Sequence, residues 1–282
     1  MPSHIFTRLG QWDESIETNQ RSARAEPDSN AAVHPMDYMV YAYLQQGRER
    51  DARRVIDRAI QNSDQFYGGT LGYNFAAMPA RYAVERSAWA EAAALRLPVR
   101  AAPNVRALTH FARAVGAARQ GNTAQASADV DSLAVVKGLL VAANDSYWAT
   151  VVDAQRLAAS AWIALASRDT ARALQLARSA ADLEETFEKH PVTPGPILPA
   201  RELEGDLLMS LGRAADALTA YEKTLAREPR RARALWGAAR AADRAGNTAA
   251  ARQRYAELLD VMAKADATRE EPAAARRYLA SH

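Results

Sequence analysis

Two histidines and an aspartate near the start of the chain have the types and spacing that suit metal chemistry. His34 and Asp37 are three residues apart, so a helix would place them on one face. His4 occupies a similar position in the preceding helical unit. Imidazole and carboxylate ligands suit zinc and related divalent cations, and the three residues therefore form a candidate metal site. The alternative interpretation is that His34 and Asp37 hydrogen-bond a helix start at Pro35, since proline fits a first helical position.

A second candidate is a group of arginines in the C-terminal third, which would attract phosphate or nucleic acid. Its members are Arg227, Arg230, Arg231, Arg233 and Arg240. Glu228 interrupts the group, and the aromatic platforms typical of single-strand binding are missing. Nucleic-acid binding is therefore a secondary alternative.

Catalytic signatures do not occur in the sequence. It contains no Gly-x-Gly-x-x-Gly, phosphate loop, His-Glu-x-x-His or Gly-x-Ser-x-Gly. There is also no cysteine, which excludes disulfides and thiolate ligands. We expect a protein that is not an enzyme and needs no cofactor.

A turn signature recurs along the whole chain and indicates which elements carry these residues. Its landmark is glycine in five of seven copies, and the copies are 34 to 47 residues apart: Gly10, Gly47, Ser87, Gly121, Arg168, Gly212 and Gly246. A small residue follows five positions later each time: Ser15, Ala52, Ala92, Ala126, Ala173, Ala217 and Ala251. Glycine readily adopts the left-handed backbone that ends a helix. The pattern predicts helical hairpins, each with a small residue where its two helices touch.

This signature resembles that of the tetratricopeptide repeat (TPR) family. The best copy runs from Gly212 through Ala217 to Pro229, and another runs from Gly10 through Trp12 to Pro27. The resemblance implies an all-α solenoid of about seven antiparallel hairpins in a right-handed superhelix. It also implies a protein-interaction scaffold that takes a peptide or partner protein in its concave groove.

The register divides the chain into one helical repeat domain, 1–282. The predicted hairpins are 1–28, 33–64, 70–100, 104–136, 147–187, 197–228 and 231–262, followed by a polar capping helix at 268–281. Segment 64–75 is glycine-rich and predicts an insertion. Segment 189–199 holds four prolines and predicts an extended connector over the surface.

The first helix of each hairpin should line the concave face. Counting back from the landmarks places the candidate partner-binding residues there: His4, Arg8, His34, Asp37, Tyr41, Asn74, Arg81, Trp162, Asp206, Trp236 and Arg240. Gln45, Glu85, Phe111, Arg119, Glu202 and Arg233 belong to the same expected face. Residues of these types give a groove its specificity.

Composition sets the remaining expectations. Hydrophobic residues make up 49% of the chain, and much of that fraction is alanine, which favours helix. No apolar run approaches the ~20 residues of a membrane span, and the N-terminus lacks a signal-peptide pattern, so a cytoplasmic location is expected. The first helix would begin about four residues before Met1, which indicates a C-terminal part of a longer repeat protein. The sequence does not identify the partner.

Overall fold

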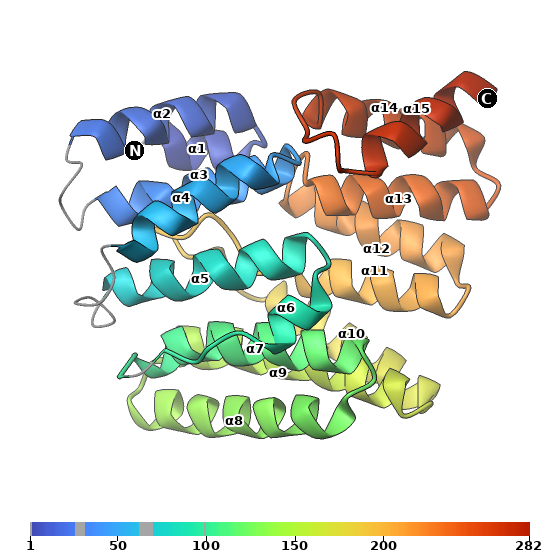
Figure 1. Cartoon of the computed structure of the whole chain (residues 1–282). Helices are drawn as coiled ribbons and strands as arrows, with labels where there is room; N and C mark the ends of the chain where they lie inside the picture. Colours follow the sequence, from blue (N-terminus) through green and yellow to red (C-terminus); the bar gives the residue numbers. More distant parts are fainter. Residues whose placement is uncertain (1, 26–31, 62–69, 99) are drawn as a thin grey trace.

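The structure, a computed structural model, describes residues 2–25, 32–61, 70–98 and 100–282. In this described part every regular element is helical, which confirms the all-α prediction (Figure 1). Pro27, the hairpin ends 26–28 and 62–64, and residues 64–69 of the predicted insertion lie outside it. The fifteen helices of the described part are α1 (Pro2–Arg8), α2 (Trp12–Ala25), α3 (Val33–Gln45), α4 (Glu49–Gln61), α5 (Thr70–Glu85), α6 (Trp89–Ala93), α7 (Pro103–Arg119), α8 (Thr123–Ala142), α9 (Ser146–Ala166), α10 (Thr170–Glu184), α11 (Ala200–Ser210), α12 (Ala214–Arg227), α13 (Ala232–Arg244), α14 (Thr248–Val261) and α15 (Glu271–Ser281).

All seven landmark residues adopt the left-handed conformation. Ser87 has φ 55° and Arg168 has φ 65°, close to the five glycines at 67–78°. Each landmark N–H bonds back to the carbonyl three residues earlier, and the next N–H bonds to the carbonyl five residues before itself. This pair of bonds is the Schellman motif, which satisfies the last carbonyls of a helix. The landmark therefore marks a true helix end even where the side chain is not glycine.

The small residue five positions after each landmark lies at the helix–helix contact. Ser15, Ala52, Ala92, Ala126, Ala173, Ala217 and Ala251 are all 0% exposed. A larger side chain at any of these seven positions would push the two helices of its hairpin apart, because the interior is close-packed.

The hairpins stack in two layers. From α3 to α13, each first helix packs against the first helix of the next hairpin, in the order α3, α5, α7, α9, α11, α13. The second helices cover this row from outside, and each also contacts its neighbour in sequence. The fold is thus a solenoid of seven hairpins whose first helices form the inner layer.

Two second helices differ in length from the predicted hairpins 70–100 and 104–136. Helix α6 ends at Ala93, five residues before Pro98, so the second helix of this hairpin has only five residues. Helix α8 continues to Ala142 and ends at a further left-handed residue, Asn144. Gly138 lies inside α8 without ending it, since glycine disfavours a helix by only about 1 kcal/mol relative to alanine.

The array closes on itself. One hydrophobic cluster joins α2–α4 with α12–α15, so the two ends of the chain share a core. The indole N–H of Trp12 donates to the Arg230 carbonyl at 3.0 Å. The backbone at Gly10 meets Pro229 so closely that a Cβ there would lie 2.4 Å from the Pro229 oxygen. Figure 1 shows α1–α4 beside α13–α15 at one end of the molecule.

Helix α15 caps the array and takes part in this closure. Pro272 stands in its first turn, where proline is favoured. The loop before it bonds to the N-terminal half: the Asp266 N–H donates to the Gly47 carbonyl at 3.0 Å, and Arg269 pairs with Glu49 at 2.5 Å. None of the helices described here has the length and apolar character needed to cross a bilayer.

Candidate binding site on the inner face

The connector, which the structure extends to residues 185–199 between α10 and α11, enters the ring in its second half. The predicted segment 189–199 is exposed at Pro191 and Val192, but the prediction of a surface position is wrong from Thr193 onward. Thr193, Ile197 and Leu198 are 7%, 1% and 2% exposed. Figure 1 shows this segment in yellow behind α4 and α5. Prolines do exclude a helix here, but an extended segment is buried because other parts of the fold bind its backbone.

Side chains from four helices bind six carbonyls of the connector. Arg8 donates to the carbonyls of Lys189 and His190, at 3.3 Å each, and Arg81 donates to those of Gly195 and Pro196 at 3.3 and 2.8 Å. Tyr147 and Arg227 bind the carbonyls of Glu188 and Phe187 at 3.2 and 3.0 Å. The inner face therefore holds an extended peptide segment, and that segment belongs to the same chain.

Asp37 and Tyr41 of α3 support this arrangement by contacting Arg81. Asp37 is 0% exposed and lies 3.6 Å from the Arg81 Nε, with both of its oxygens free of hydrogen bonds to the described residues. Burial raises the pKa of Asp37 to about 6 against the opposing charge of Arg81. The guanidinium of Arg81 also stands 4.8 Å from the ring centre of Tyr41. The Tyr41 hydroxyl accepts from Arg231 at 3.2 Å, so neither Asp37 nor Tyr41 faces an open groove.

His4 and His34 meet, but Asp37 does not join them. Their Nε2 atoms are 3.1 Å apart, and His4 stacks on Tyr38 with ring centres 4.6 Å apart. In the described part of the chain, no three His, Cys, Asp or Glu side chains are grouped to hold a metal. The predicted metal set is therefore not assembled. The capping alternative is also wrong, because the N-cap of α3, Ala32, receives no side-chain hydrogen bond and Asp37 faces Arg81.

The arginine group 227–240 is mostly neutralised within the fold. Arg231 is 0% exposed and pairs with Glu85 and Glu202, each at 2.7 Å. Burial alone would raise the pKa of Glu202, but the charges of Arg231 and Arg233 outweigh it and lower that pKa. Arg230 pairs with Asp260 at 2.7 Å, and Arg227 is bound to the connector. The group does not form a continuous basic surface for nucleic acid.

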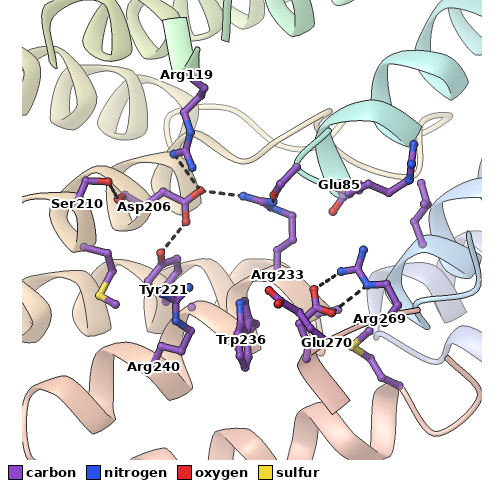
Figure 2. A pocket seen from close by; sticks show the side chains of 18 of the residues that line it. Glu85, Arg119, Asp206, Ser210, Tyr221, Arg233, Trp236, Arg240, Arg269 and Glu270 are labelled. Atoms are coloured by element: carbon purple, nitrogen blue, oxygen red, sulfur yellow. Dashed lines mark hydrogen bonds and ion pairs between the residues drawn. The ribbon is translucent and has the colours of Figure 1, made fainter. Parts of the chain in front are cut away.

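One part of the inner face is open. A cavity of about 370 Å³, which we call the arginine pocket, lies where α7, α11 and α13 end and α15 begins (Figure 2). Six arginines and four carboxylates are among its lining residues: Arg86, Arg119, Arg233, Arg240, Arg244, Arg269, Glu85, Asp206, Glu270 and Glu271. Trp236 and Tyr221 form aromatic parts of its wall.

Most of the charges in the arginine pocket are fixed by partners. Asp206 accepts from Arg233 and from the Tyr221 hydroxyl, at 2.8 and 2.7 Å. Arg119 stands between two indoles, 4.0 Å from the ring centre of Trp162 and 4.7 Å from that of Trp89. It reaches Asp206 only at 4.0 Å, and its buried Nη1 lacks a hydrogen bond within the described residues. Burial lowers the pKa of Arg119. Figure 2 shows both guanidinium groups turned toward Asp206.

Arg240 and Arg244 differ from these residues because neither pairs with a carboxylate in the described part of the chain. Both belong to α13, and Arg240 lies 5.3 Å from the ring centre of Trp236. Arg86, Arg233 and Arg269 each have an acidic partner. The other unpaired charge among the described lining residues is Glu270, which is exposed.

The structure thus divides the eleven predicted site residues. Arg8, Tyr41, Arg81, His4, His34 and Asp37 surround the connector-filled part. Asn74 is 4% exposed and lines a separate cavity of about 270 Å³ together with His34. Asp206, Trp236 and Arg240 line the arginine pocket, and Trp162 contacts it through Arg119. The prediction missed Arg244, although it stands four residues after Arg240 and so shares its face of α13. Arg269 was missed because it comes from the loop before α15.

Comparisons with known proteins concern the fold. No family model and no curated protein matches the sequence. The chain is similar to the crystal structure of a tetratricopeptide repeat protein from Parabacteroides merdae, with 12% identity and a TM-score of 0.45 over 99% of this chain and 95% of that one. It is also similar to the APC/C hetero-tetramer Cut9–Hcn1, with 16% identity, a TM-score of 0.45, and 98% of this chain and 47% of that one covered.

Proposed function

We propose that this protein is a non-catalytic interaction scaffold that binds an acidic segment of a partner protein in the arginine pocket. The connector occupies much of the inner face, and the arginine pocket is the larger of the two cavities that predicted groove residues line, at about 370 Å³ against about 270 Å³ for the one beside His34 and Asn74. The observation that carries the proposal is the pair Arg240 and Arg244, which line this cavity without an acidic partner in the described chain.

The pocket is organised to receive carboxylates. Arg233 and Arg119 are held in place by Asp206 and by two indoles, so little side-chain freedom is left for them to lose on binding. Arg240 and Arg244 supply charge that no described carboxylate neutralises. Trp236 offers an apolar surface beside them, where the stem of a glutamate would pack. Charge-assisted hydrogen bonds of this kind are stronger than neutral ones.

The direct test is fluorescence anisotropy of the full chain with a labelled hexaglutamate peptide. Reversing both charges with Arg240→Glu and Arg244→Glu should weaken binding by about tenfold or more, since each arginine contributes roughly 1 kcal/mol at a partly exposed site. The single variants Arg240→Glu and Arg244→Glu are compared with Arg252→Glu as the matched control. Arg252 is an exposed arginine on α14, outside the pocket. Glu270→Gln should strengthen binding, because it removes a like charge from the rim.

Two results would count against the proposal. The first is equal affinity of the double variant and the wild type. The second is tighter binding of a single-stranded oligonucleotide than of hexaglutamate, lost with the same two variants, which would assign the pocket to nucleic acid. Affinity for hexaglutamate should also fall as salt is raised, because exposed charges are screened.

A further inference from the structure

A second cavity, separate from the arginine pocket, lies beside the connector. Its volume is about 60 Å³, and aromatic rings form much of its wall. Tyr147 lies with its ring centre 5.2 Å from that of Trp148 and 5.6 Å from that of Phe187, and Tyr73 closes another side 5.5 Å from Trp148. We call it the aromatic cavity. Arg240 and Arg244 do not line it, so it is independent of the function proposed above.

Gln155 of α9 lines the aromatic cavity with its hydrogen-bonding capacity unused. It is 8% exposed, and its buried Oε1 has no donor within the described residues. A buried amide oxygen without a donor is unfavourable, and such groups are normally paired. The amide therefore requires a donor from a molecule in the cavity.

Glu184, at the end of α10, adds a carboxyl group to the same wall. One oxygen accepts the Ala200 N–H at 2.8 Å, and no cation of the described chain pairs with the group. Burial raises the pKa of Glu184 to about 7. That shift is the expected property of a carboxyl group that lacks a positive partner.

The two cationic side chains of the cavity wall are already engaged elsewhere. Lys189 pairs with Glu228 at 2.9 Å and donates to the Arg227 carbonyl at 2.6 Å. Arg227 donates to the Phe187 carbonyl at 3.0 Å. The cavity thus offers unused acceptors and aromatic faces, and the described cations do not satisfy them.

We infer that the aromatic cavity binds a small ammonium group, of the size of methylammonium or the end of an alkylamine. Such a group would donate to Gln155 and to Glu184 while its positive charge faced the rings. Cations are attracted to aromatic faces in this way, and burial strengthens the attraction. A volume of about 60 Å³ matches roughly two waters, which is the size of this ligand.

A route to the aromatic cavity exists along the connector. Four of its lining residues also line the cavity of about 270 Å³ that contains His34 and Asn74: Tyr73, Trp148, His190 and Thr193. The two spaces therefore adjoin, with Trp148 and His190 in the wall that they share.

The test is a methylammonium titration of the full chain, followed by the Trp148 indole N–H signal in NMR spectra. We expect a saturable shift with a dissociation constant on the order of 10 mM, which is near the limit for a ligand of two heavy atoms. Glu184→Gln keeps the acceptor for Ala200 but removes the charge, and should weaken binding about tenfold. Glu188→Gln, an exposed change four residues along, should leave it unaltered.

Methanol at equal concentration and sodium chloride at equal ionic strength are the ligand controls. An equal Trp148 shift with methanol, a linear response without saturation, or an unchanged affinity in Glu184→Gln would each overturn the inference. A linear response would mean that methylammonium does not bind the cavity, and the other two results would mean that its positive charge is not recognised there. Gln155→Leu gives a second check, because it should also weaken the methylammonium response if the amide binds the ligand.

Discussion

At the scale of single residues, the inner face consists of charged side chains that bind backbone carbonyls. Arg8 and Arg81 each donate to two carbonyls of the connector. A proline-rich segment has few N–H groups and forms no ladder of its own, so its carbonyls need donors from elsewhere when it is buried. The two arginines supply them from α1 and α5, which are more than 100 residues away in sequence.

The contact between His4 and His34 makes stability depend on pH. Burial lowers the pKa of both imidazoles, and for His4 the neighbouring His34 lowers it further. The folded protein therefore binds fewer protons at these sites than the unfolded chain. Stability from this pair is complete above the unfolded pKa near 6.5 and should fall as the pH drops below it.

Urea unfolding between pH 7.5 and 5 would measure this effect. His34→Phe should flatten the dependence below pH 6.5, because it removes one imidazole whose pKa is lowered, while Asp37 and Glu184, whose pKa values are raised, are left unchanged. The exposed His282→Gln is the control and should retain the wild-type slope. A slope that is unchanged by His34→Phe would contradict the role of the pair.

At the scale of helices, the Schellman turn is the unit that the chain repeats. Arg168 adopts φ 65° with an exposed side chain, at a position where five of the seven copies have glycine. A left-handed backbone costs a residue with a Cβ roughly 1 kcal/mol. Arg168→Gly should therefore stabilise the protein by about 0.5–1 kcal/mol in chemical denaturation. The control is Lys223→Gly in the middle of α12, which should destabilise the protein by about 1 kcal/mol. A loss of stability in Arg168→Gly would contradict the left-handed conformation of Arg168.

Sequence reasoning predicts the helical hairpins well because their determinants are local. The landmark and the small residue five positions later are read within one turn, and both occupy the expected conformation in all seven copies. The helix lengths are less well predicted, since the hairpin pattern contains neither the early end of α6 at Ala93 nor the extension of α8 to Ala142. The location of the connector could not be predicted, because it depends on donors from distant helices.

In the candidate site, too, the local pattern predicts which residues face inward but not which distant residues they contact. Counting back from the landmarks places Asp206, Trp236 and Arg240 on the inner layer, and the structure brings them to one pocket. Counting back from the landmarks does not show which arginines are paired with carboxylates from other helices. Arg231 and Arg240 belong to the same helical repeat, yet the first is buried between two glutamates and the second has none.

At the scale of the whole molecule, closure of the ring ties both ends of the chain into one core. Gly10 is the tightest point of this contact. Gly10→Ala should destabilise the protein more than Gly212→Ala does. Both glycines have a positive φ, so the backbone strain of the two changes is similar. A Cβ at Gly10 would in addition clash with the Pro229 oxygen, whereas nothing lies within 4 Å of a Cβ at Gly212. Thermal unfolding of the two variants gives the comparison. Equal losses would mean that the ends are not in close contact in solution.

Closure and the connector together leave the arginine pocket open on the inner face, and the central claim of the account is that an acidic ligand binds there. Hydrogen–deuterium exchange of the full chain with and without saturating hexaglutamate tests it most directly. The account predicts slower exchange in α13 and in residues 266–271, with unchanged exchange in the connector. Protection of the connector or of α3 and α5, without protection of α13, would contradict it, because the ligand would then occupy the place of the connector.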